Sequence, residues 1–394
     1  MRSARTASES AHGFHLQAST FGGYRVERVL STGTLGAVVS ARHLLRDEVV
    51  VIKLLHPELR QDPVSMARLS REAHVLAHVA SEYVVRLLDT GWTDEVGPYL
   101  VLEHLVGMDL ARMLETSGPL PLPLAVDYVL QACEGLAVAH ARGITHRDLK
   151  PENLFAVRSG SAPQLKLLDF GIAQHGPESF PYREIAPEVE GEGPLLGTPA
   201  YMSPERIREL PSADQRSDVW SLGVVLHELL TGRTPFARNS SEHSQFERGD
   251  PERNEADICQ RVMSHSFALE SNRALLPPPL RAVIQRCLGR QPAERYQTVE
   301  ELAAALRRVA AMPERWRGTL TGKFSRQMLA EEGSSAKAAA VRVPPVRVLP
   351  VRVPRSAPRR WGVGVWLALA LAAAALSGSL VAKLEQPAAA TQSQ

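Results

Sequence analysis

An eight-residue run, His146 to Asn153, carries side chains that could do chemistry. Asp148 can accept a hydrogen bond from a substrate hydroxyl, and Lys150, two residues on, can neutralise a phosphoryl group during its transfer. Asn153 can bind Mg²⁺ through its amide oxygen, and Asp169, which opens an Asp-Phe-Gly triplet, can hold a metal that bridges phosphates. This combination predicts the transfer of a phosphoryl group to a hydroxyl.

A second group of residues, upstream, could bind phosphates. Gly33 and Gly36 lie in a turn between two strand-like segments, where the lack of a Cβ lets backbone N–H groups approach phosphate oxygens. Alone, two such glycines are weak evidence, because most glycine turns only reverse the chain. Lys53 ends a buried apolar strand, which is a costly place for an ammonium without a partner. Glu72, on an amphipathic helical segment, could be that partner.

The ordered set of these motifs resembles that of eukaryotic-type (Hanks-type) protein kinases, specifically their bacterial serine/threonine branch. The resemblance runs from residue 24 to about 310 and includes the HRDLKPEN and DFG motifs and the run GTPAYMSPE at 197–205. It implies a two-lobed α+β protein-kinase fold, with a small antiparallel sheet and one helix in the N-lobe (24–104) and a mainly helical C-lobe (105–310). It also implies ATP with Mg²⁺, or Mn²⁺, as cofactors and proteins as substrates.

The resemblance also implies roles for single residues. Asp148 becomes the catalytic base, while Lys150 is the signature of serine/threonine specificity and Thr198 helps to position base and substrate. Lys53 would bind the α and β phosphates with Glu72 as its ion-pair partner. The metal ligands would be Asn153 and Asp169. The nucleotide-binding residues would be Leu30, Ser31, Gly33, Gly36, Val38, Lys53, Glu103 and Leu105.

Further implied roles concern the framework. Leu102 resembles the gatekeeper before the hinge at 103–105, which would hydrogen-bond adenine. Asp218 would brace the catalytic loop, and Glu205 would pair with Arg295.

The sequence departs from the family pattern at three places. Ser31 replaces the first glycine of the phosphate loop, and Ser203 replaces the alanine of the Ala-Pro-Glu motif. Between 171 and 197 there is no threonine, and the only hydroxyl side chains are Ser179 and Tyr182, among five glutamates. Either one of these glutamates supplies the charge that Arg147 would otherwise receive from a phosphate, or Ser179 or Tyr182 is phosphorylated. The sequence favours neither.

Apolar patterning predicts the elements that position these residues. Strands are expected at Tyr24–Leu30, Ala37–Arg42 and Val49–Leu55, and a helix opens at Pro63. Beyond Pro119 helices should dominate. They are expected at Pro123–Arg142, Ser217–Thr231 and Leu280–Leu288.

The composition is that of a globular protein with local exceptions at its ends. The chain has 394 residues with 45 Lys and Arg against 43 Asp and Glu, so charge gives no case for nucleic-acid binding. Its three cysteines lack the spacing of a zinc site or a disulfide framework. Residues 1–23, rich in Ser, Ala and His, are expected to be a disordered leader. The stretch 237–257 is expected to be an enlarged solvated loop.

The C-terminal region has the pattern of a membrane anchor. Residues 361–382 contain no charge, and 22 residues of helix would measure about 33 Å, enough for the bilayer core. A Pro- and Arg-rich linker, 311–360, precedes this span, and its arginines predict a cytoplasmic flank. The alternative is a buried Ala-rich helix of a soluble fold. With a transmembrane helix at 361–382, residues 383–394 would form a short extracytoplasmic tail.

These observations predict a serine/threonine protein kinase that acts from the cytoplasmic side of the inner membrane and is anchored in the lipid bilayer by a single span. Dimerisation for autophosphorylation is compatible with this. One alternative is a pseudokinase that serves as a binding scaffold, which would be expected to lack Lys53, Asp148 or Asp169. Another is a small-molecule phosphotransferase, which would not be expected to carry the run at 197–205.

Overall fold

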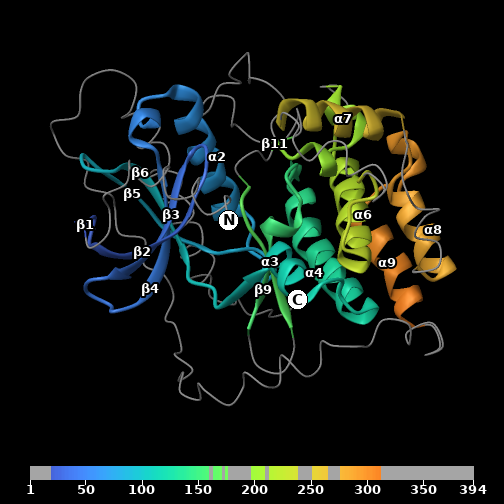
Figure 1. The fold of residues 1–394 in the computed structure, drawn as a ribbon. Helices are drawn as coiled ribbons and strands as arrows, with labels where there is room; N and C mark the ends of the chain where they lie inside the picture. Colours follow the sequence, from blue (N-terminus) through green and yellow to red (C-terminus); the bar gives the residue numbers. More distant parts are fainter. Residues whose placement is uncertain are drawn as a thin grey trace, which may run out of the picture. The chain divides into compact units, whose positions relative to one another are not determined.

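The computed structural model describes residues 19–158, 163–170, 174–175, 197–208, 213–237, 251–264 and 276–311 (Figure 1). Several predictions fall outside these residues: the leader up to 18, nearly all of 171–196 with Ser179 and Tyr182, residues 238–250 of the predicted loop 237–257, the linker from 312, the span 361–382 and the tail 383–394. The loop prediction is wrong for residues 251–257, because they form the first part of helix α7 (Pro251–Ser264).

The N-lobe is built on one antiparallel sheet of six strands in the order β1-β2-β3-β4-β6-β5. The strands are β1 (Thr20–Phe21), β2 (Tyr24–Thr32), β3 (Gly36–His43), β4 (Val49–Leu55), β5 (Leu87–Thr93) and β6 (Gly97–Glu103). Side chains alternate between the two faces, so Val39, Ala41 and Ile52 are fully buried in a core with Tyr99 on one face. The other face is therefore available for the helix and for the functional side chains.

Helix α2 (Pro63–His78) covers part of that second face. Pro63 stands at its first position and the Asp62 side chain caps it by accepting the Ser65 N–H at 2.8 Å. Leu69 and Ala73 of α2 pack against Leu100 of β6 in a small buried cluster. This packing brings the helix over the strand that carries Lys53.

The C-lobe is mainly helical and packs around α6. Its helices are α3 (Leu110–Ser117), α4 (Leu122–His140), α5 (Pro204–Ile207), α6 (Arg216–Thr231), α7 (Pro251–Ser264), α8 (Pro278–Cys287) and α9 (Val299–Ala310). In α6 every residue from 217 to 227 is buried. Trp220, which is fully buried, stacks on Phe236 with ring centroids 5.7 Å apart. Polar side chains on so deeply buried a helix need hydrogen-bond partners within the protein, and Asp218 is one such polar side chain.

Short strands and turns in the C-lobe carry the functional loops. They are β7 (Gly107–Asp109), β8 (Ile144–Thr145), β9 (Leu154–Val157), β10 (Gln164–Leu167) and β11 (Gln174–His175), with 3₁₀ turns at η2 (Pro57–Leu59), η3 (Pro151–Asn153), η5 (Pro199–Tyr201) and η7 (Pro292–Glu294). β10, β9 and β7 form a three-stranded sheet, and β8 pairs with β11. The catalytic run His146–Asn153 therefore lies between two strands, β8 and β9.

The structure corrects several predicted boundaries. The sheet starts before residue 24, because Thr20–Phe21 pairs with β2 and Phe21 is buried against Tyr99. Helix α3 lies before Pro119, the position beyond which helices were expected to dominate. The long helix ends at His140 rather than Arg142, since the chain turns through Gly143, whose φ is +71°. Helix α6 starts one residue early, at Arg216, and α8 covers Pro278–Cys287.

Among the described residues, α4 alone is long and apolar enough to cross a membrane by those two criteria, and more than half of it is buried in the C-lobe. The cysteines at 133, 259 and 287 are all free thiols, as their spacing predicted.

Candidate active site

The catalytic loop gathers three predicted residues around one carboxylate. Lys150 Nζ lies 3.3 Å from Asp148 Oδ2 and donates to Thr198 Oγ at 3.2 Å. Asn153 donates from Nδ2 to the Asp148 backbone oxygen at 2.7 Å and to its Oδ2 at 3.0 Å. These contacts fix the direction of the carboxylate. A group that accepts a proton from a hydroxyl must be oriented in this way. Asp148, Lys150, Thr198 and Asn153 thus form one cluster, although Thr198 follows Asp148 by fifty residues.

Asp218 holds the backbone of this loop from below. Its carboxylate accepts the N–H of His146 and that of Arg147, each at 2.9 Å, and is 2.7 Å from Nε2 of His140. Arg147 has a φ of +67°, a strained value for a residue with a side chain, so the loop depends on these bonds. Burial alone would raise the pKa of Asp218, but the hydrogen bond and charge of His140 and its other donors outweigh burial and hold it below the ordinary value. The predicted bracing role is confirmed.

Asp169 is tied to the catalytic loop through its neighbours. The N–H of Leu168 donates to the Asn153 backbone oxygen at 2.9 Å, and the His146 ring nitrogen Nε2 is 3.0 Å from the Leu168 oxygen. Phe170 is fully buried with its ring centroid 4.4 Å from that of His146. Asp169 itself has a φ of +54°. The hydrogen bond between the backbones of Leu168 and Asn153 therefore brings Asp169 close to Asn153, and both residues could bind a metal.

The donor set suits a hard divalent cation. Asn153 uses its amide nitrogen toward Asp148, which leaves the amide oxygen as a ligand, and Asp169 offers a carboxylate that is about half exposed. One or two protein oxygens completed by phosphate and water are the usual surroundings of Mg²⁺ at a nucleotide. The residues present thus fit a divalent metal bound together with phosphates.

Lys53 connects the N-lobe to this group. In the sheet it stands opposite Val38 on one side and Leu100 on the other, so it shares the face on which α2 packs. Its Nζ is 2.6 Å from Glu72 Oε2 and 3.0 Å from Asp169 Oδ1. The strand lysine and helix glutamate therefore form the predicted pair, and the pair reaches Asp169, the predicted metal ligand.

The ionisation of this pair reflects its burial. Burial opposes a charge on Lys53, but the carboxylates of Glu72 and Asp169 prevail and raise the pKa of its ammonium above the ordinary value. Burial raises the pKa of Glu72 to about 7, against the opposing effect of Lys53. Lys53 therefore stays a cation, while Glu72 titrates near neutrality.

The phosphate loop is a hairpin between β2 and β3. Its ends are joined by a bond from Gly33 N–H to the Gly36 oxygen at 2.8 Å. A Cβ on Gly36 would lie 1.7 Å from the Leu54 oxygen, so only glycine fits there, whereas a Cβ on Gly33 would meet nothing within 4 Å. The sequence did not predict that His56, just after β4, binds the Gly33 oxygen through Nε2 at 2.7 Å.

The remaining nucleotide-binding predictions surround this hairpin. Ser31 stands opposite Val38, which in turn stands opposite Lys53, so the three side chains share a face of the sheet. Leu30 is 39 % exposed, and Leu105 lies between β6 and β7. The structure thus places Ser31 and Val38 beside Lys53.

The segment predicted as hinge is fastened by a side-chain contact that the sequence did not predict. Glu103 Oε1 accepts from Lys166 Nζ at 2.7 Å and from the Arg86 N–H at 2.9 Å. Lys166 lies on β10 and also donates to the Val84 oxygen at 3.2 Å. Three segments that are distant in sequence therefore meet at Lys166, whose side chain is only 12 % exposed.

Comparison with known proteins agrees with this geometry. The family model for the protein kinase domain matches residues 24–305. The chain belongs to the protein kinase family. Serine/threonine-protein kinase pkn3 of Myxococcus xanthus is 33 % identical over 292 residues, which make up 73 % of this chain and 50 % of that protein. Serine/threonine-protein kinase PknB of Mycobacterium leprae is 34 % identical over 291 residues, 73 % of this chain and 43 % of that protein. The chain spans half or less of the length of these curated relatives.

As in the family pattern, this kinase domain has the ion pair between Glu205 and Arg295. The guanidinium binds the carboxylate through two contacts of 2.7 Å each, and both side chains are buried. Arg295 also lies over the Trp220 ring, 5.0 Å from its centroid. Arg295, through its hydrogen bonds and its charge, holds the pKa of Glu205 below its usual value although burial opposes this. Ser217 Oγ also donates to Glu205 Oε1 at 2.9 Å. The pair anchors the segment that follows Thr198 to the core.

Proposed function

We propose that this protein kinase transfers the γ-phosphoryl group of Mg-ATP to serine or threonine hydroxyls of proteins. The observation that carries the proposal is the arrangement of Asp148, Lys150 and Thr198 at one end and Lys53, Glu72 and Asp169 at the other. A bound divalent metal would supply charge neutralisation on the phosphates. The two protein ligands are both oxygens, a donor type that suits Mg²⁺ and Mn²⁺ alike, so the site is compatible with either ion.

The chain's own residues have separate tasks in this reaction. Lys53 holds phosphate oxygens, and Glu72 keeps its ammonium in place. Asp148 orients the attacking hydroxyl and accepts its proton. Lys150, between Asp148 and Thr198, places a positive charge beside the phosphoryl group as it moves. The serine/threonine preference is supported by Lys150 and by the names of the relatives.

The test is phosphotransfer by the purified full chain. With γ-labelled ATP and a general acceptor protein, we expect label on serine and threonine, dependent on Mg²⁺. Lys53→Met should remove it, while Arg86→Met, which changes an exposed cation outside this cluster, should not. A wild-type chain that binds ATP but transfers no phosphoryl group to any acceptor, including itself, would favour the pseudokinase scaffold instead.

We also propose that the kinase is anchored in the cytoplasmic membrane by residues 361–382, with the kinase domain inside. The proposal is supported by the uncharged span and by three arginines at 355, 359 and 360 before it. Protease added outside spheroplasts should spare residues 24–310. Digestion of the domain in intact spheroplasts, or recovery of the full chain in the soluble fraction, would contradict the anchor.

A further inference from the structure

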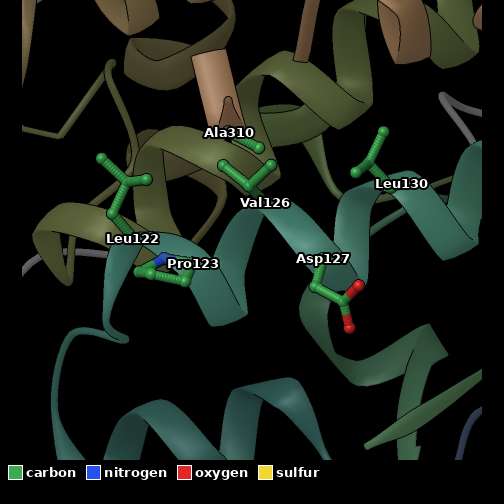
Figure 2. Close-up of a pocket in the computed structure, with 6 residues that line it drawn as sticks. All are labelled: Leu122, Pro123, Val126, Asp127, Leu130 and Ala310. Carbon is green, nitrogen blue, oxygen red and sulfur yellow. The ribbon is translucent and has the colours of Figure 1, made fainter. Parts of the chain in front are cut away.

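A hollow on the C-lobe lies where the kinase domain ends and the linker begins. It has a volume of about 150 Å³ and is lined by Leu122, Pro123, Val126, Asp127 and Leu130 of α4 and by Ala310 of α9. Figure 2 shows Leu122, Val126 and Leu130 in a row along α4, with Ala310 next to Val126. Ala310 is the last residue of α9, so the chain leaves the helix at the edge of the hollow. The surface is apolar except for Asp127.

The residues that follow α9 match this surface in chemistry. Pro313 follows the α9 cap, Ala311, by two residues, and proline lacks the N–H that a continuing helix would need. Trp316 is the first aromatic residue after the helix, and Arg315 and Arg317 flank it. Six residues can extend about 20 Å, so Trp316 reaches any point of a hollow that Ala310 itself lines.

The charge of the hollow also favours the segment around Trp316 as its occupant. Asp127 is its single ionisable side chain, and Gln131 occupies one carboxylate oxygen, Oδ2, at 2.8 Å. An aromatic ring with an arginine on each side would cover the apolar row and place a cation next to Asp127. Because the segment is attached at the rim, its local concentration there far exceeds that of a free partner.

We infer that the segment 312–317 folds back onto the domain, with the Trp316 ring in the hollow between α4 and α9 and Arg315 or Arg317 beside Asp127. The docked segment fixes where the linker leaves the domain. It thereby shortens the free part of the tether to residues 318–360. The inference does not depend on phosphotransfer, so either can fail while the other holds.

The experiment measures how fast chymotrypsin cuts the full chain after Trp316. In the wild type this cut should be slow, and Asp127→Lys should accelerate it about tenfold by undocking the segment. Exchanging the charges, Asp127→Lys together with Arg315→Glu and Arg317→Glu, should restore protection. Asp127→Asn keeps an oxygen for Gln131 and should give an intermediate rate. Glu115→Lys, on exposed surface of α3, is the matched control and should leave the rate unchanged.

A second measurement identifies the occupant. With a benzoylphenylalanine photo-crosslinker in place of Trp316, we expect crosslinks to α4 near Val126 within the same molecule, and none from the same group placed at Phe324. Equal cutting of wild type and Asp127→Lys would overturn the inference. Crosslinks between two copies, lost on dilution, would also overturn it and would assign the hollow to a second chain.

Discussion

The two sides of the active site are held in different ways. On the C-lobe side, the catalytic loop is fixed by a fully buried carboxylate, Asp218, that accepts two backbone N–H groups and binds His140. On the N-lobe side, the phosphate loop is a hairpin closed by backbone bonds, and Ser31 and Gly33 in it are exposed. Under the proposed function, the reacting hydroxyl would meet a base held by buried hydrogen bonds, while the nucleotide would meet an exposed hairpin that can adjust.

Among changes to the residues that hold the two sides, the largest effect should follow from removing the Asp218 carboxylate. In Asp218→Asn, the amide NH₂ faces N–H donors, which should cost about 2 kcal/mol of unfolding free energy. Displacing Asp148 by as little as 1 Å should lower kcat about 100-fold. Asp214 binds Arg216 near the surface, so Asp214→Asn should change neither the unfolding free energy nor kcat by much. Thermal unfolding and initial rates provide the measurements, and equal behaviour of the two variants would contradict a special role for Asp218.

The pH dependence of stability in Asp218→Asn tests the role of Asp218 further. The folded-state pKa of Asp218 lies below its ordinary value of 3.8, so its contribution to stability is present above that value and lost as pH falls through the folded pKa. The stability difference between wild type and Asp218→Asn should therefore be constant between about pH 5 and 8. A difference that grows or shrinks in that range would mean that another group titrates.

A smaller effect is expected at the Lys53–Glu72 ion pair, which links the N-lobe side to Asp169. Because the pKa of Glu72 is about 7, its carboxylate is mostly ionised at higher pH and mostly protonated at lower pH. The wild-type kcat/KM for ATP should therefore fall between about pH 8 and 6, and Glu72→Gln should lose about tenfold at the upper end and less at the lower. Parallel pH profiles for wild type and Glu72→Gln would contradict the assignment, and Glu115→Gln is the exposed control.

The hairpin gives a comparison between two glycines. Gly36→Ala places a methyl group against the Leu54 oxygen, which should cost about 2 kcal/mol of stability and raise the KM for ATP about fivefold. Gly33→Ala, with open space around the Cβ, should change the KM for ATP less than about twofold. If Gly33→Ala were the more harmful change, backbone approach to phosphate rather than strand packing would dominate this loop.

The smallest effect concerns the hinge. Lys166→Met removes the cation that joins Glu103 to the Val84 oxygen, and it should raise the KM for ATP about threefold with little change in kcat. Arg86→Met is the control, since its guanidinium lies 3.9 Å from Glu103 and is half exposed. A fall in kcat with unchanged KM would place Lys166 on the catalytic side instead.

Motif residues could be predicted from the sequence because each motif is a run of specified residue types at fixed spacing. The strand Val49–Leu55 was also predicted at its observed limits, since its apolar residues are continuous. The strands β7, β8, β9 and β11 were not predicted, because two to four residues carry no measurable period. The contacts between Lys166 and Glu103 and between His56 and Gly33 were missed for another reason. Such pairs depend on sheet register and lobe packing, and neither residue type nor spacing indicates them.

The central claim is that Asp148 takes part in phosphoryl transfer and not in nucleotide binding. The direct measurement is Asp148→Asn in the full chain, with turnover followed by labelled phosphate on an acceptor protein and ATP affinity by calorimetry in Mg²⁺. We predict that turnover falls at least about 1,000-fold while the Kd for ATP stays within about threefold, since the nearest partners of Asp148 are Lys150 and Asn153. Turnover within about tenfold of the wild type would contradict the account.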